Sequence, residues 1–230
     1  MRRRFSRLAL PGLTTLILLA VLIGLGTWQV ERLQWKLRIL AQIARAEASP
    51  PIPLPPDPQP WMKVEVTGTL RNDLTALYGA EVRDTASGPT MGSELIVPLD
   101  RNDAPPLLVD RGWVPAARRG PLSQPVQAVT VVGYVHPPEV PGWFSASDDL
   151  PGRQFFTLDP QAIGRAMGLA QVAPFTLVAM GPPPPEGWPI PAQHLPRPPN
   201  NHLSYAITWY GLAIALIVIF FLWARKAVRQ

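Results

Sequence analysis

Two long apolar segments lie near the two ends of the chain. The first runs from Leu8 to Val30. The second occupies residues 200–223, and from Leu203 onward it holds 21 residues without a charged side chain. A helix rises about 1.5 Å per residue, so about 20 apolar residues cross the roughly 30 Å hydrocarbon core of a bilayer. The pattern therefore predicts a membrane protein with two transmembrane α-helices, over residues 8–30 and 200–223.

Each predicted span carries two small residues four positions apart. These are Ala20 and Gly24 in the first span, and Gly211 and Ala215 in the second. Such pairs let helices approach closely in lipid. Because both chain ends are expected on one side of the membrane, the two helices should form an antiparallel pair.

The segment after the first span keeps a helical period. Arg32, Trp35 and Ile39 recur at spacings of three and four residues, which predicts an amphipathic helical extension over residues 31–48. This extension either continues outward and packs on the domain that follows, or bends and lies on the membrane surface. Proline-rich segments at residues 49–60 and 182–199 predict stiff, extended linkers.

Between residues 61 and 181 the hydrophobic period changes to two, which is typical of half-buried strands. One short helix is expected here, with Asp159 as its N-cap and Pro160 at its first position. Short strands without regular helices between them favour an antiparallel barrel or sandwich, so we expect a mainly β exported domain of about six strands. The predicted strands are residues 61–70, 74–81, 94–99, 106–114, 129–135 and 175–180.

The chain has 21 basic and 16 acidic residues, and the basic excess lies in its two tails. Residues 1–7 and 224–230 hold seven of the basic residues, so the rest has 14 basic against 16 acidic residues, a net charge of −2. Basic residues beside short spans mark the cytoplasmic side. We therefore expect two cytoplasmic tails, an uncleaved first span, an exported middle domain, and no nucleic-acid partner.

The residue types present exclude several kinds of chemistry. The chain has no cysteine, which excludes disulfides, thiolate metal sites and a CxxC redox motif. Its sequence also lacks a nucleophile elbow, an HExxH motif and a phosphate-binding glycine loop. We therefore expect that the protein is not an enzyme.

The strongest candidate for a binding site lies where the second span begins. His202, Tyr205 and Trp209 share one face of the predicted helix. In an antiparallel pair, Trp28 and Arg32 lie at the same membrane depth. An imidazole, aromatic walls and an arginine suit a flat, anionic, apolar ligand such as haem, with His202 as axial iron ligand and Arg32 paired with a propionate.

A simpler interpretation of the same residues stays open. Histidine, tyrosine and tryptophan are common where a helix leaves the membrane. An asparagine at position 200 or 201 can cap the helix without any role in ligand binding.

Three motifs resemble a known family, and they occur in the expected order along nearly the whole chain. They resemble the surfeit locus protein 1 family of cytochrome c oxidase assembly factors, in its bacterial form. The motifs are Gly26-Thr27-Trp28-Gln29 followed by Arg32 and Lys36, then Arg111-Gly112-Trp113-Val114-Pro115, then the run NNHLSYAITWY from Asn200 to Tyr210.

The resemblance implies a chaperone that binds haem a transiently and assists its insertion into the catalytic subunit of the oxidase. The histidine of the family at the start of the second span corresponds to His202. It also implies a bacterial inner-membrane protein with a periplasmic middle domain. The implied partners are the lipid bilayer, the catalytic subunit and, as a further candidate, haem a synthase.

Two alternatives remain open at this point. The protein could be a membrane scaffold that stabilises an oxidase assembly intermediate without a cofactor, with the Arg111–Pro115 motif as contact surface. For that motif, the competing interpretation is a corner at a strand end with Trp113 in the core.

Overall fold

The computed structural model of the chain describes residues 2–86, 88–117, 128–185 and 187–229. It divides into two compact units, Met1–Gln42 with Arg197–Gln230, and Ile43–Pro196. Met1 and Gln230, at the ends of the two predicted basic tails, lie outside the described residues.

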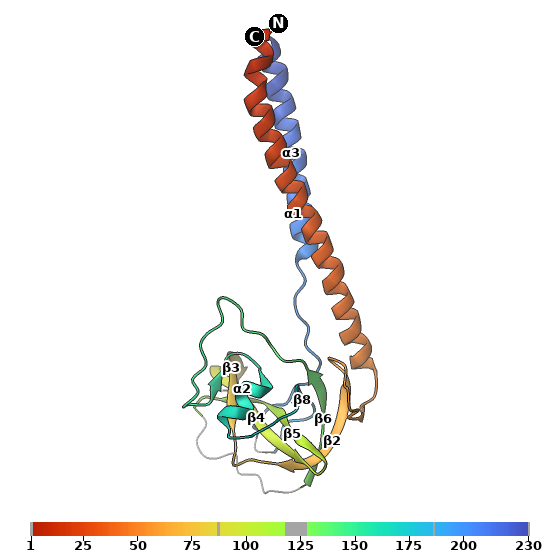
Figure 1. Cartoon of the computed structure of the whole chain (residues 1–230), viewed down its shortest axis with the longest axis vertical. Coiled ribbons are helices and arrows are strands. Elements are labelled where there is room, and N and C mark those ends of the chain that lie inside the picture. Colours follow the sequence, from red (N-terminus) through yellow and green to blue (C-terminus); the bar gives the residue numbers. More distant parts are fainter. Residues whose placement is uncertain (1, 87, 118–127, 186, 230) are drawn as a thin grey trace. The chain divides into compact units, whose positions relative to one another are not determined.

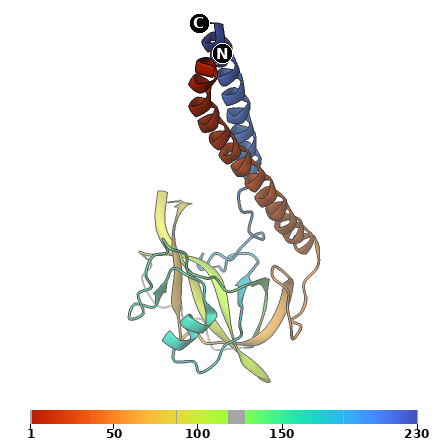
Figure 2. The same ribbon diagram turned by 45° about the horizontal axis from the view of Figure 1, so that its top comes forward.

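The first unit is a pair of antiparallel helices (Figures 1 and 2). Helix α1 spans Arg2–Ala48, and helix α3 spans His202–Arg229. Residues 31–48, the predicted extension, continue α1 without a break. Both helices are long and apolar enough to cross a membrane.

The two helices meet along a seam in which the less exposed residues alternate at spacings of three and four. This spacing keeps one stripe of each helix against its partner, as in a coiled coil. The seam positions are Gly12, Thr15, Leu19, Leu22, Gly26 and Gln29 in α1, and His202, Ala206, Trp209, Ala213, Leu216 and Phe220 in α3.

The small-residue pairs predicted to join the helices lie elsewhere. Ala20, Gly24, Gly211 and Ala215 are all exposed, and a Cβ added to either glycine would meet nothing within 4 Å. The prediction was wrong because a span that is apolar all round does not reveal which side faces its partner. The close approach occurs at Gly26 instead.

The second unit contains an eight-stranded sheet of order β1-β2-β6-β8-β5-β4-β3-β7, with an additional pairing between β2 and β4. The strands are β1 (Ile52–Pro53), β2 (Lys63–Leu70), β3 (Ala76–Thr85), β4 (Gly88–Arg101), β5 (Ala104–Pro115), β6 (Ala128–His136), β7 (Gln154–Phe155) and β8 (Thr176–Ala179). Figure 1 shows β4 and β5 side by side within this unit.

The prediction of a mainly β domain is confirmed, but its details were wrong. The described sheet has eight strands rather than about six, it is mixed rather than antiparallel, and it is not a barrel. The two missed strands, β1 and β7, have two residues each and pair in parallel, so neither is long enough to show an alternating pattern. Strand β8 pairs with β6 and β5 in opposite senses, which periodicity cannot reveal.

Strands β4 and β5 are buried on both faces. Leu95, Val97 and Leu107 contribute to one cluster of buried residues, whereas Ile96 and Leu108 contribute to a second. Helix α2 (Pro160–Ala166) adds its buried face to the second cluster. The predicted cap of this helix is confirmed, because the side chain of its N-cap, Asp159, accepts a hydrogen bond from the backbone of Gln161 at 2.9 Å.

The Arg111–Pro115 motif belongs to the core. Trp113 is fully buried, and its backbone exchanges two 2.9 Å hydrogen bonds with Ile190. Gly112 has a φ of +113°, and a Cβ there would overlap the carbonyl group of Ile190. Part of the predicted linker 182–199 therefore packs on β5, and the core interpretation of Trp113 is confirmed.

Candidate functional site

His202 is the first residue of α3, where capping groups and seam residues meet. Its backbone N–H donates to the side-chain oxygen of Asn200 at 3.4 Å. The capping role considered for the asparagine is therefore present. This bond gives Asn200 a role at the start of the helix. It uses only the backbone of His202, so the imidazole can bond to another residue.

That partner is Gln29, a buried amide on the facing side of α1. Its Oε1 lies 2.7 Å from Nδ1 of His202. With the amide oxygen facing the ring, Nδ1 carries the proton and donates it, since a carbonyl oxygen can only accept. Among the described residues, Nε2 makes no hydrogen bond. Nε2 is therefore the ring nitrogen that is available to a ligand.

A second contact between the helices lies next to Gln29 along α1. The hydroxyl groups of Thr27 and Tyr210 lie 3.2 Å apart. The ring of Tyr210 passes so close to Gly26 that a Cβ added there would come within 2.8 Å of it. Glycine at position 26 thus permits the approach that brings Gln29 to His202.

Within the part of the chain that the structure describes, no hydrogen bond joins the side chains of the other predicted site residues to this pair. Trp28 and Tyr205 are 50% and 55% exposed. The guanidinium of Arg32 lies over the ring of Trp35, 4.6 Å from its centroid, and Trp209 occupies the seam. Their roles as ligand contacts remain predictions.

Gln29 is the residue whose role the sequence did not reveal. It belongs to the first of the three motifs, but no pattern assigned it a function. One signal for a contact with the other helix was available in the sequence. Gln29 lies three residues after Gly26, on the stripe of α1 that also contains the small or polar residues Gly12 and Thr15.

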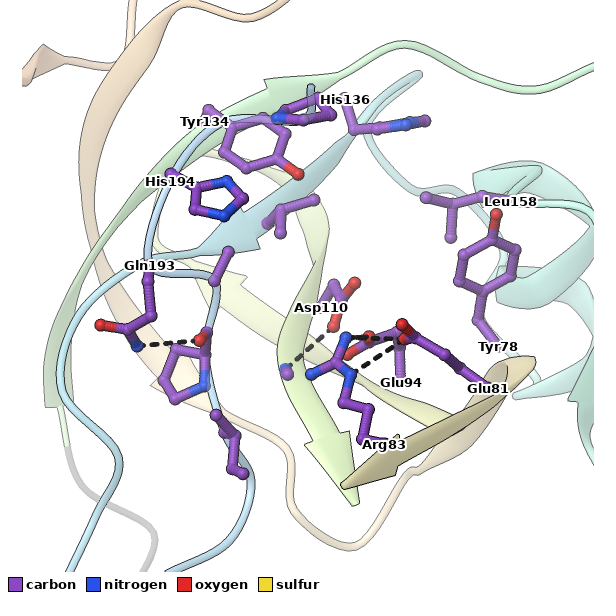
Figure 3. Close-up of a pocket in the computed structure, with 16 residues that line it drawn as sticks. Tyr78, Glu81, Arg83, Glu94, Asp110, Tyr134, His136, Leu158, Gln193 and His194 are labelled. Atoms are coloured by element: carbon purple, nitrogen blue, oxygen red, sulfur yellow. Dashed lines mark hydrogen bonds and ion pairs between the residues drawn. The ribbon is translucent and has the colours of Figure 1, made fainter. Parts of the chain in front are cut away.

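A second candidate site, which the sequence did not predict at all, is a cavity of about 580 Å³ in the β unit. Figure 3 shows charged and aromatic side chains arranged around it. They come from strands β3, β4, β5 and β6 and from the segment Ile190–Pro196. These positions are distant in sequence, so no local pattern marks them.

Burial in the cavity disfavours the ionised form of two of the carboxyl groups that line it. Burial raises the pKa of Glu94 to about 7, although the guanidinium of Arg83 opposes the shift. Burial also raises the pKa of Asp110 well above its usual range, and the nearby charge of Glu94 adds to this. For His136, burial lowers the pKa, so this imidazole is neutral at pH 7.

Comparison with known proteins gives a consistent result across the chain. The family model described as SURF1 family matches residues 16–214. A SURF1-like protein of Rickettsia felis is 32% identical over 94% of this chain and 98% of its own length. Surfeit locus protein 1 of Mus musculus is 30% identical over 94% of this chain and 75% of its own length. The human protein of that name is 28% identical over 90% and 74%.

Proposed function

The chain belongs to the SURF1 family, and from this membership and the histidine of the helix pair we propose an assembly factor for cytochrome c oxidase. It binds haem a through His202 and assists the insertion of this haem into the catalytic subunit of the oxidase. The protein acts by binding and transfer, not as an enzyme.

The observation that carries the proposal is the 2.7 Å hydrogen bond between Gln29 Oε1 and His202 Nδ1. Histidines that bind metals commonly donate their second ring N–H to a carbonyl or carboxylate group, which fixes the tautomer and orients the ring. A histidine that only lined a membrane boundary would not need a buried amide behind it. With Nδ1 bonded to Gln29, Nε2 is the ring nitrogen that we assign as the ligand atom.

The side chains near His202 suit a haem in their chemical character. His202 would hold haem a, which when bound would supply an iron atom for the imidazole and a flat apolar ring with propionates. Trp28, Tyr205 and Trp209 provide aromatic surface, and the first two are half exposed. Arg32 makes no ion pair within the described residues, so its guanidinium can pair with a propionate.

The exposed surface of the helix pair supports a location in the inner membrane. Large apolar side chains such as Leu16, Ile17, Ile207 and Ile214 are 57–65% exposed, which suits lipid and not water. Basic residues at both helix ends beyond the spans favour cytoplasmic termini and a periplasmic β unit. Haem a synthase is the donor that such a carrier would meet in the same membrane.

The proposal is tested in a bacterium that lacks its own copy of this gene and makes haem a. The strain receives wild type, His202→Ala, or the control Ser204→Ala, which changes an exposed residue of the same helix. We expect His202→Ala to lower the haem a content of the purified oxidase at least tenfold, at equal amounts of the assembly factor in membranes. Ser204→Ala should behave as wild type.

Normal haem a content in the oxidase with His202→Ala would contradict the proposal. If such cells then lost oxidase only when Arg111 was replaced, the scaffold alternative would be favoured, with Arg111 as its contact residue. Trp113 is not a useful contact variant because it is fully buried.

A further inference from the structure

The cavity in the β unit has an exposed rim and a buried floor (Figure 3). Glu81, Gln193 and His194 at the rim are exposed. Asp110 at the floor is 4% exposed. A volume of about 580 Å³ lies within the range of small-molecule sites, about 300–1,000 Å³. The cavity is therefore open to a ligand that reaches Asp110.

The carboxylate of Asp110 has one partner and one free oxygen. Oδ1 accepts a hydrogen bond from the backbone N–H of Gly112 at 2.9 Å. Oδ2 has no hydrogen-bond partner among the described residues, and Figure 3 shows it directed toward the middle of the ring of lining side chains. Among the described residues, Oδ2 is not one of the buried side-chain atoms that lack a partner, so it faces the open cavity, where a ligand can donate to it.

Arg83 is the one guanidinium among the lining residues, and it does not bond to Oδ2 of Asp110. Its Nη2 donates to Glu94 at 2.7 Å, and its Nε donates to Glu81 at 2.9 Å. It is thus shared between two carboxylates and forms no bond to Asp110. The cavity holds three carboxyl groups against one fixed cation, and a second cation bound there would favour the ionised form of Asp110 over the neutral form that burial favours.

The two histidines that line the cavity already use their Nδ1–H groups within the protein. Nδ1 of His136 donates to the carbonyl of Pro137, and Nδ1 of His194 donates to that of Leu195, each at 2.8 Å. Because burial lowers the pKa of His136, the neutral ring of this residue keeps Nε2 as an acceptor. Leu158, Val178 and Ile190 supply apolar wall beside these groups.

We propose that this cavity binds a guanidinium or primary ammonium group carried on an alkyl stem, with Asp110 as the buried counter-charge. The head group donates to Asp110 Oδ2, and the stem lies against the apolar wall toward the rim. Free alkylamines and the side chains of arginine and lysine share this chemistry. The site is in the β unit and is independent of the haem proposal, so either can fail without the other.

Binding to the purified full chain in detergent is measured by ligand-observed NMR. Agmatine represents a free small cation, and N-acetyl-arginine amide represents a side chain presented by a polypeptide. The matched neutral probe is N-acetyl-citrulline amide, which has nearly the same shape as the arginine probe. We expect a Kd on the order of 1 mM for the tighter cationic probe, and binding at least tenfold weaker for the citrulline probe.

The variants separate the buried carboxylate from general surface charge. Asp110→Asn keeps an acceptor for the Gly112 N–H and should weaken cation binding at least tenfold, whereas Asp103→Asn, which changes an exposed carboxylate in the β4–β5 turn, should leave it unchanged. Glu94→Gln serves as a second cavity variant if Asp110→Asn does not fold. The proposal is overturned if neither cationic probe binds below 20 mM, if citrulline and arginine probes bind equally, or if the folded cavity variant binds as wild type. Tighter binding of agmatine would identify a free amine as the ligand, and tighter binding of the arginine probe would identify a polypeptide side chain.

Discussion

Replacing Gln29 by leucine should weaken haem binding without touching the iron ligand itself. Leucine has a similar size but offers no acceptor to Nδ1 of His202, which now donates to Gln29 Oε1 at 2.7 Å. Gln29 is only 9% exposed, so water cannot easily replace the amide. The Nδ1–H group would be left unpaired, and the ring would lose the partner that fixes its tautomer.

Two estimates give the same size of effect. Leaving a buried donor unpaired costs about 1–3 kcal/mol. Removing the partner behind a metal-binding histidine typically weakens metal binding about 10–100-fold, which corresponds to about 1.4–2.7 kcal/mol. We therefore expect the Kd for haem a to rise between about tenfold and 100-fold in Gln29→Leu.

The assay is an absorption titration with haem a of haem-free protein in detergent. Gln34→Leu is the matched control, because Gln34 is exposed on the same helix, and it should bind haem a as wild type does. Gln29→Glu adds a readout that mere loss of packing would not produce. A carboxylate behind the imidazole makes it a stronger donor to iron, so the haem reduction potential should fall. A Kd for Gln29→Leu within twofold of wild type, or an unchanged potential in Gln29→Glu, would refute this reasoning.

Three further predictions concern packing and pH. Gly26→Ala should destabilise the helix pair by about 1–3 kcal/mol, because the added Cβ would meet the ring of Tyr210. The purified protein should then retain less haem. If the clash is the cause, adding Tyr210→Ala should restore haem retention. Trp113→Ala should lower the free energy of unfolding, measured by denaturant titration, by about 3–5 kcal/mol. The control Trp143→Ala, at a fully exposed site, should change it by less than about 0.5 kcal/mol. Equal effects of the two substitutions would contradict the assignment of Trp113 to the core. Burial raises the pKa of Glu94 from 4.5 to about 7. The folded state therefore binds the proton of Glu94 more tightly than the unfolded state, and the free energy of unfolding should fall as pH rises from about 4.5 to 7. Glu94→Gln should flatten that slope and be the more stable protein at pH 8; a slope as steep as in wild type would show that Glu94 is not its source.

Alternation of apolar and polar residues predicted the long strands but not their arrangement. Lys63–Leu70 and Ala104–Pro115 were found because one or both faces of each strand pack on a core. Ile52–Pro53 and Gln154–Phe155 were missed because two residues carry no period. The pairing of Trp113 with Ile190 joins segments far apart in sequence, and nothing local to either one specifies it.

The candidate site residues also divide into those that the sequence identified and those that required the structure. His202 could be identified from its motif and its position at the start of a span. The role of Gln29 depends on how α1 is rotated, and a helix that is apolar on all sides hides its rotation. The cavity around Asp110 depends on the pairing of β3, β4, β5 and β6, so it required the structure.

The most direct test of the central claim is the absorption spectrum of the protein purified in detergent from cells that make haem a, with the haem identified after extraction. We predict that wild type carries haem a, that His202→Ala carries less than a tenth as much, and that His194→Ala, which changes a histidine of the β unit, carries the wild-type amount. Haem a retained in full by His202→Ala would contradict the claim that His202 is its ligand.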